Sequence, residues 1–108
     1  MSFKAIFLSD VHLGTKQCKA KELLDFLATV KCDYLFLVGD IIDGWALRRK
    51  HYWPKSHTEV LRRILKLSER CKVIYLPGNH DEFVRPFLKE DMKLGNVEIV
   101  DSYVFENV

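Results

Sequence analysis

The chain has 108 residues, of which 48% are hydrophobic and 30% are charged, a composition typical of a globular protein and unlike that of a disordered segment. The formal net charge of +2 is too small to indicate a nucleic-acid partner by itself, so a polyanionic partner would need a local basic patch. Three cysteines without CxxC spacing argue against a disulfide framework and a thiolate zinc site. We expect one domain over residues 1–108, in a reducing compartment.

The sequence shows no targeting or membrane-spanning pattern. Residues 1–8 lack a charged region followed by a long apolar stretch, and no apolar run approaches the ~20 residues that a spanning helix needs. We therefore expect a cytoplasmic protein, and the same features are compatible with a peripheral position at the inner membrane.

The N-terminal third predicts a strand, a helix and a second strand. Residues 3–8 are rich in β-formers and indicate the first strand. Residues 19–31 place their apolar side chains mostly on one face at helical spacing, which indicates an amphipathic helix. Residues 34–38 are continuously apolar and end at Gly39, which is typical of a short strand covered on both faces.

A second helix and a third strand follow an irregular stretch. Ser56 and Glu59 form a capping-box pair, which predicts the start of a helix that ends near Arg70. Residues 72–76 indicate a buried strand that is stopped by a Pro-Gly pair.

The C-terminal part predicts a short helix over residues 82–90, and its residues 97–100 and 103–105 alternate like two more strands. The order of the preceding elements is βαβαβ. Strands that alternate with helices imply parallel pairing and right-handed crossovers, so we expect an α/β fold with a parallel sheet and flanking helices.

Three polar clusters each lie where an apolar run stops, at residues 10–12, 39–43 and 78–81. The carboxyl ends of parallel strands share one edge of a sheet, where ligands collect in open α/β folds. The candidate metal ligands in these clusters are Asp10, His12, Asp40 and Asn79. Such oxygen and nitrogen donors suit hard or borderline divalent cations.

Asp10 and His12 are expected to share one cation, because residues two apart on an extended chain point to the same side. Asp40 follows Gly39 at a strand end, where a carboxylate can bridge two cations about 3.5–4 Å apart. The alternative for Asp40 is that it caps a loop, which would explain one cluster but not three.

Asn79 offers a neutral carbonyl oxygen to a second cation, and the alternative is an ordinary turn residue. His80 is adjacent and cannot easily share the same metal, so it is better placed as a proton donor or as a cation that faces the substrate. We expect Asp43 to hold the His80 imidazole in one tautomer, and take His80 and Asp43 as the catalytic pair.

The motifs D-x-H, G-D-x-x-D and G-N-H-D occur in this order and resemble the calcineurin-like metallophosphoesterase superfamily. The resemblance implies the N-terminal half of a metallophosphoesterase-type α/β sandwich. It also implies a site with two divalent metal ions, Mn²⁺ first and Fe²⁺, Zn²⁺ or Mg²⁺ as alternatives. The implied metal ligands are Asp10, His12, Asp40 as the bridging group, and Asn79, with His80 acting on the leaving group or transition state.

Within the superfamily, residues 8–14 and 39–45 look most like the UDP-2,3-diacylglucosamine pyrophosphatase branch. Gly44 stands where phosphoprotein phosphatases usually carry arginine, which argues against a protein substrate. His80 stands where the lipid-A pyrophosphatases tend to carry arginine, so a relative with a different substrate is the alternative. The resemblance implies a phosphate-containing small molecule or lipid as the substrate.

The second metal site is incomplete in this sequence. The superfamily completes its site with further histidines, and His80 is the last histidine of this chain. The alternatives are a fragment of a longer enzyme and a shortened relative, and whether the chain is active alone is left open. Sheet edges that the rest of the fold would cover favour self-association, so a homodimer or an exchange of strands between two copies is predicted as a possibility.

The stretch from Trp45 to His57 is basic and aromatic, and contains no acid. Arg48 and Arg49 are candidate phosphate-binding residues, with Arg85 as a weaker one, and the alternative is a solvated loop whose aromatic rings lie on the core. Three functional hypotheses follow: a metallophosphoesterase, a non-catalytic interaction module with the same fold, and a nuclease-like phosphodiesterase.

Overall fold

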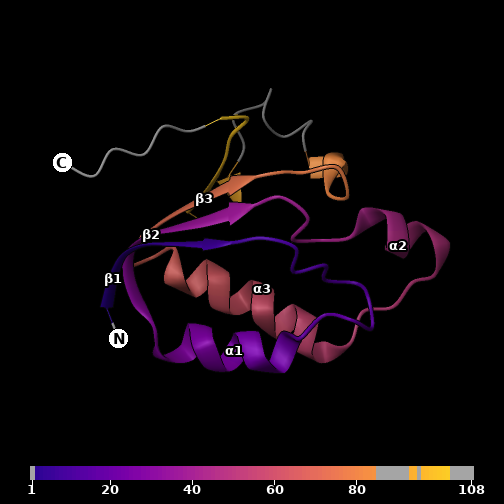
Figure 1. Cartoon of the computed structure of the whole chain (residues 1–108), viewed down its shortest axis with the longest axis horizontal. Coiled ribbons are helices and arrows are strands. Elements are labelled where there is room, and N and C mark those ends of the chain that lie inside the picture. Colours follow the sequence, from indigo (N-terminus) through magenta and orange to yellow (C-terminus); the bar gives the residue numbers. More distant parts are fainter. Residues whose placement is uncertain (1, 85–92, 95, 103–108) are drawn as a thin grey trace.

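The computed structural model describes residues 2–84, 93, 94 and 96–102 of the chain (Figure 1). The elements in chain order are β1 (Ser2–Leu8), α1 (Ala20–Thr29), β2 (Lys31–Val38), α2 (Gly44–Arg49), α3 (Lys55–Leu67), β3 (Lys72–Leu76), the 3₁₀ turn η1 (Glu82–Val84), β4 (Lys93–Leu94) and β5 (Val97–Ile99). Within these described residues, no helix has the length and apolar character needed to cross a membrane.

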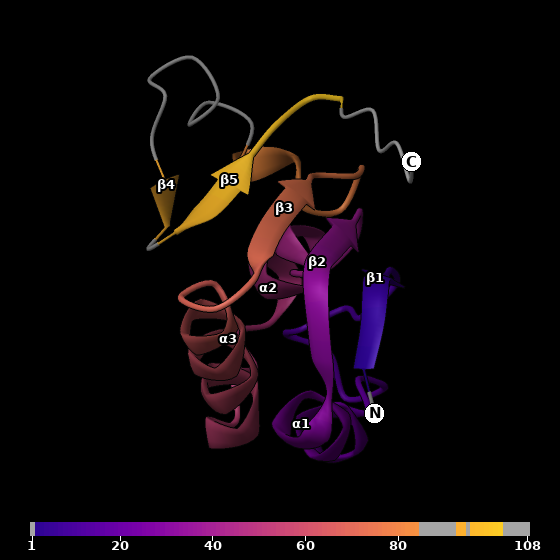
Figure 2. The same cartoon turned by 90° about the vertical axis from the view of Figure 1, so that its left-hand side faces the viewer.

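The strands form one sheet in the order β1-β2-β3-β5-β4 (Figure 2). Each neighbouring pair from β1 to β5 is parallel, and β4 lies antiparallel to β5. Helices α1 and α3 lie side by side against one face, below the sheet in Figure 1. The expected α/β fold with a parallel sheet and flanking helices is confirmed.

The core lies between the sheet and these two helices because alternate strand residues point toward them. The strands contribute Leu35 and Leu37 from β2 and Val73 from β3, and the helices contribute Leu27 from α1 and Val60 from α3. All five are at most 3% exposed. Complete burial of a side chain of this size stabilises the fold by roughly 1.5–3 kcal/mol.

The opposite face of the sheet carries a row of aromatic rings. Phe7 of β1 stacks on Phe36 of β2 at 4.7 Å between centroids, and the rings of Tyr34 and Phe36 are also stacked, at 6.0 Å between centroids. Phe36 is buried, whereas Phe7 is 61% exposed. The face near β1 is therefore partly open, and the expected homodimer stays a prediction.

Two expectations about the connection between β2 and β3 are wrong. The stretch expected to be irregular contains α2, which begins because the Asp43 side chain accepts a hydrogen bond from the backbone N–H of Ala46. The predicted capping box does not form, because α3 begins one residue before Ser56 and has no side-chain cap. Pro54 precedes the helix, and its carbonyl accepts the His57 N–H.

Near the C-terminus, the predicted helix over residues 82–90 is a 3₁₀ turn where the structure describes it, since η1 covers 82–84. The strand expected at 97–100 is present as β5, and β4 was not predicted. The strand expected at 103–105 lies outside the described residues.

His57 connects α3 to the loop that follows β1. The side chain is 2% exposed, and its Nδ1 accepts a hydrogen bond from the Gly14 N–H at 3.0 Å. The rings of Tyr52 and Trp53 contact it edge-on. Burial lowers the pKa of His57 below its ordinary value of 6.5, because the charged imidazolium is poorly solvated there.

We predict that His57 makes the protein less stable in mild acid. The unfolded chain takes up a proton near pH 6.5 but folded His57 does so only at lower pH, so the free energy of unfolding falls as pH drops below about 6.5. His57→Gln keeps an acceptor and does not titrate. Urea unfolding at about pH 7.5 and 5.5 should show a larger decrease for the unsubstituted protein, by at most about 1.4 kcal/mol per pH unit. Equal decreases in the two proteins would contradict this role.

Candidate metal centre

The loops that follow β1, β2 and β3 meet at one end of the sheet, on the right in Figure 1. Backbone hydrogen bonds join them: the His12 N–H donates to the Asp40 carbonyl at 2.9 Å, and the Gly44 N–H donates to the His80 carbonyl at 2.8 Å. The three polar clusters of the sequence therefore converge, as their positions after parallel strands predict.

The backbone at this junction has an uncommon conformation. Asp10, His12 and Asp40 have φ angles of 55°, 52° and 53°, in the left-handed region. They are the non-glycine residues with positive φ in the described part of the chain. A strained left-handed conformation at a non-glycine residue raises the free energy of the folded state by about 1–3 kcal/mol. Residues in such conformations concentrate at functional sites.

Asp10, His12 and Asp40 bring one donor atom each to within 4.8 Å of one another. Asp10 Oδ1 lies 3.6 Å from His12 Nε2. The assumption that an extended backbone brings Asp10 and His12 together is wrong, because left-handed turns at both residues produce the approach. Two carboxylates and one imidazole form a mixed oxygen and nitrogen donor set that fits Mn²⁺, Fe²⁺ or Zn²⁺, and Mg²⁺ less well.

Asp43 contacts both histidines of the site. Its Oδ2 lies 3.1 Å from Nδ1 of His12 and 3.1 Å from Nδ1 of His80, while its Oδ1 accepts the Ala46 N–H. A carboxylate only accepts, so each imidazole must carry its proton on Nδ1. Nε2 of His12 then remains free for a cation. The expected contact between Asp43 and His80 is present, and the contact with His12 was not predicted.

Asp43 and His80 influence each other's ionisation. Burial alone would raise the pKa of Asp43, but hydrogen bonds from Ala46, His80 and His12 outweigh it and lower the pKa. The hydrogen bond with Asp43 in turn raises the pKa of His80, and the negative charges of Asp43, Asp40 and Asp81 act in the same direction. His80 therefore holds a proton more readily than an ordinary histidine, as a proton donor requires.

The sequence reasoning gave Asp81 no role, yet Asp81 holds two of the loops together. Its side chain is fully buried. The two carboxylate oxygens accept hydrogen bonds from four donors: the N–H groups of Gly78, Asp40 and Ile41 and the hydroxyl of Tyr75. The adjacent G-N-H sequence is the signal that could have drawn attention to this residue.

Trp45 is a second residue without a predicted individual role. Its indole ring stacks on the His80 imidazole at 4.2 Å between centroids, with 23° between the ring planes, and 50% of the residue is exposed. Trp45 follows Gly44 in α2. A Cβ atom added at Gly44 would lie 2.7 Å from the Phe83 ring, so the start of α2 can approach η1 this closely only because residue 44 is glycine. The aromatic character of the stretch after Asp43 was the available signal.

For the other predicted site residues, the structure gives less evidence of a role in this metal centre. Asn79 is exposed on the loop between β3 and η1, so its role as a metal ligand stays a prediction. Arg48 and Arg49 are exposed in the last turn of α2, and Arg48 lines a small hollow beside His80 and Trp45. Arg85 lies outside the described residues.

We predict that Asp81→Asn lowers the free energy of unfolding by about 2–4 kcal/mol. The amide nitrogen introduced by asparagine faces backbone N–H donors and leaves at least one of them without an acceptor. Urea denaturation measures the change. Asp25→Asn on the exposed side of α1 removes the same charge and should change stability by less than about 0.5 kcal/mol. A similar small effect at Asp81 would show that its hydrogen bonds are not needed.

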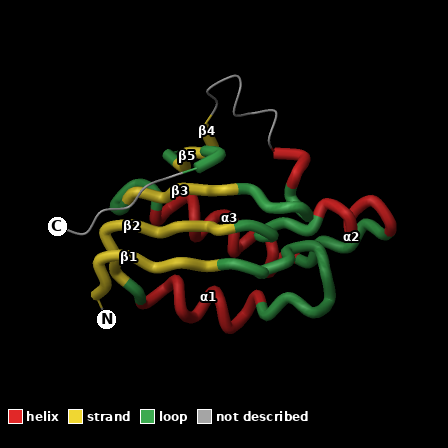
Figure 3. Tube along the Cα trace, turned by 45° about the horizontal axis from the view of Figure 1, so that its top comes forward, coloured by secondary structure: helices red, strands yellow, loops and turns green. Residues whose placement is uncertain are grey.

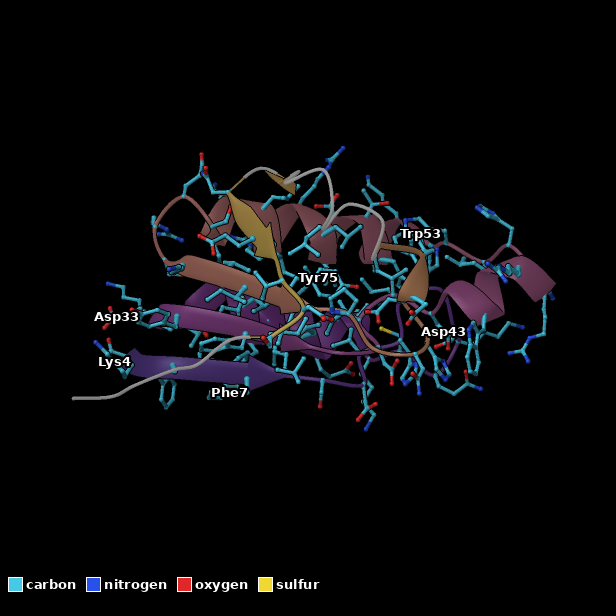
Figure 4. The ribbon with its side chains drawn as sticks, turned by 90° about the horizontal axis from the view of Figure 1, so that it is seen from above. Lys4, Phe7, Asp33, Asp43, Trp53 and Tyr75 are labelled. Carbon is cyan, nitrogen blue, oxygen red and sulfur yellow. The ribbon has the colours of Figure 1, made fainter. Side chains whose placement is uncertain are left out.

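We predict that Asp40→Asn weakens Mn²⁺ binding at least about tenfold, because a charged oxygen donor becomes neutral. Isothermal titration calorimetry measures the affinity. Asp33→Asn is the matched control, since Asp33 pairs with Lys4 at the opposite end of the sheet from Asp43 (Figure 4). Equal affinities in the Asp40 and Asp33 variants would exclude Asp40 as a ligand.

Comparisons with known proteins give similarities in sequence and in fold. The DNA polymerase II small subunit of Pyrococcus abyssi is 26% identical over 128 residues, which cover 91% of this chain and 21% of that protein. The corresponding subunit of Methanocaldococcus jannaschii is 29% identical over 101 residues, which cover 74% of this chain and 17% of that protein. The chain thus spans about a fifth of the length of these relatives.

Among solved structures, Pseudomonas putida nuclease MPE superposes with a TM-score of 0.55 and 22% identity, over 94% of this chain and 50% of the nuclease, which shows a shared fold. The fold of this chain is the sheet with helices on one face that Figure 3 draws by secondary structure. Residues 3–107 match the family described as Calcineurin-like phosphoesterase. The match includes all three polar clusters and the loops that bring them together. The chain belongs to the calcineurin-like phosphoesterase family.

Proposed function

We propose that this chain carries a divalent-metal site of a phosphoester hydrolase, in which Asp10, His12 and Asp40 hold the cation. The observation that carries the proposal is the left-handed backbone at these three residues. Unfavourable backbone conformations persist only where the surrounding structure enforces them, and here they bring three donor atoms together. A divalent cation bound there would act as a Lewis acid on a phosphoryl group.

His80 and Asp43 supply the proton chemistry in this proposal. Asp43 holds the His80 proton on Nδ1, and the raised pKa of His80 favours the charged imidazolium, whose Nε2–H can donate to a departing oxygen. Trp45 stacks on the imidazole and restricts its rotation. Asp43 is a positioning residue, because it acts through His80 and does not need to touch the substrate.

Asp40 and Asn79 are the proposed ligands of a second cation, with Asp40 bridging. Two donors are too few for tight binding, so we expect the second cation to bind this chain more weakly than the first. Mn²⁺ is the preferred candidate for both positions, because it accepts carboxylate, carbonyl and imidazole donors.

The substrate proposed most broadly is a phosphodiester or a diphosphate. The UDP-2,3-diacylglucosamine pyrophosphatase branch is the finer proposal that the sequence motifs suggest, and neither the relatives nor the solved structure described above carries that name. The name of the structural neighbour, a nuclease, instead supports a nucleic-acid phosphodiester.

A non-catalytic interaction module is the second candidate function. The relatives described above are named as small subunits of DNA polymerase II, and each match includes most of the length of this chain. In that case the metal centre would serve to hold the three loops, and the protein would bind metal without turnover.

We predict that the protein with Mn²⁺ hydrolyses bis-p-nitrophenyl phosphate, and that His80→Ala lowers kcat by about 10²–10⁴-fold because it removes the general acid. Mn²⁺ affinity should change by less than about threefold, since His80 is not among the proposed ligands. His51→Ala, at an exposed histidine between α2 and α3, is the control and should leave kcat unchanged.

Several outcomes would decide against parts of this assignment. Hydrolysis that is absent at every Mn²⁺ concentration, together with stoichiometric binding, would favour the non-catalytic module. Equal losses of kcat and of Mn²⁺ affinity in the His80 variant would instead identify His80 as a metal ligand.

A further inference from the structure

Two adjoining hollows lie beside the metal centre, at the same end of the sheet. The first has a volume of about 310 Å³ and lies between the loop after β1 and the end of α2. Lys16 lines it from the loop, and Arg49, Lys50 and Tyr52 line it from the other side. Among the described residues that line this hollow, none is acidic.

The second hollow has a volume of about 350 Å³ and continues from the first. The two share Lys16 and Tyr52, and the second adds Lys19 and Lys21 at the start of α1. Glu22 is the acidic residue among those described along its wall. We call the two hollows together the basic groove, whose cationic residues are Lys16, Lys19, Lys21, Arg49 and Lys50.

The backbone of α1 adds to the positive potential of the basic groove. Lys19 is the N-cap of this helix and makes no side-chain cap, so the first N–H groups of α1 lack a capping acceptor from it. The N-terminus of a helix carries about half a positive charge and favours anions. Lys16, Lys19 and Lys21, which line the second hollow, act in the same direction.

The first hollow of the basic groove lies next to the metal centre along the chain. Gly14 lines the first hollow and lies two residues after His12, and the Thr15 hydroxyl donates to the His12 carbonyl at 2.8 Å. Across the hollow, α2 begins at its N-cap Asp43 and presents Arg49 in its last turn. The groove is therefore built from the same two segments, the loop after β1 and α2, that follow the metal ligand His12 and begin at Asp43.

We propose that the basic groove binds the phosphate backbone of a single-stranded nucleic acid. Five cations against one acid exceed what a single phosphate requires, and they are spread over two successive hollows. The apolar side chains that line the two hollows are small ones, Ala46, Cys18, Ala20 and Pro54, and the described lining includes no leucine, isoleucine, valine or phenylalanine that would hold an acyl chain. Tyr52 lies between the hollows and provides an aromatic face for a base, and proteins that bind single strands combine these two features.

This inference rests on the proposed function and deepens it, because it names a nucleic-acid strand as the class of substrate. The net charge of +2 does not indicate the groove, because its basic residues form a local cluster and acidic residues elsewhere on the chain balance their charge. The charge that a polyanion meets is that of the groove and not that of the whole protein.

Fluorescence anisotropy of a labelled oligothymidylate of about 12 nucleotides tests the proposal, with EDTA present so that no hydrolysis occurs. The combined variant Lys16→Glu, Arg49→Glu, Lys50→Glu should bind at least about tenfold more weakly than the unsubstituted protein at about 50 mM salt. Its slope of log affinity against log salt should be smaller in magnitude by about 2, since each cation contributes about 0.7.

The matched control is Arg62→Glu, Arg63→Glu, Lys66→Glu on α3, which changes the net charge equally outside the basic groove. It should lose less than about threefold in affinity. Equal losses in the two triple variants, or no measurable binding by the unsubstituted protein, would overturn the proposal. Circular dichroism of both variants verifies that they are folded.

The test separates this inference from the proposed function. Oligothymidylate binding in EDTA does not require metal or catalysis, and bis-p-nitrophenyl phosphate hydrolysis is measured separately. If the protein hydrolyses bis-p-nitrophenyl phosphate but does not bind oligothymidylate, only the proposal for the basic groove is overturned. A protein that binds the strand through these cations but never hydrolyses the diester overturns the catalytic proposal alone.

Discussion

The buried Asp81 carboxylate is the constraint on which the site depends. Parallel strands deliver loops to one end of a sheet but do not fix how those loops approach one another. Asp81 accepts the N–H groups of Asp40 and Ile41 from the loop after β2, and the Gly78 N–H from its own loop. Gly78 lies so close to this junction that a Cβ would be 3.0 Å from Asp40 Oδ1. Close packing and a buried charge together give the loops one arrangement.

Asp43 is a second constraint, because the same side chain caps a helix and contacts both histidines of the site. One of its oxygens begins α2, and the other accepts from His12 and His80. The same carboxylate therefore leaves His12 Nε2 free for a cation and holds a proton on His80. The proposed metal and proton functions are coupled through one side chain, which stays ionised because its hydrogen bonds lower its pKa despite burial.

The end of the sheet where the loops after β1, β2 and β3 meet thus combines three kinds of group. A mixed donor set lies at the loop junction, an imidazole with a raised pKa lies beside it, and a cationic groove lies next to both. These features together match the chemistry of phosphodiester recognition, in which cations position the backbone and a metal centre acts on phosphorus. The family assignment and the physical features of the chain agree.

The sequence by itself determined strands β1, β2 and β3, the two helices α1 and α3 between them, and the convergence of Asp10, Asp40 and His80, because hydrophobic periodicity and the geometry of parallel strands are local and topological properties. Only the tertiary structure decided that left-handed turns bring Asp10 toward His12, that Asp81 joins the loops, and that the cations form a groove. These features depend on contacts between residues distant in sequence, and periodicity and composition contain no information about such contacts.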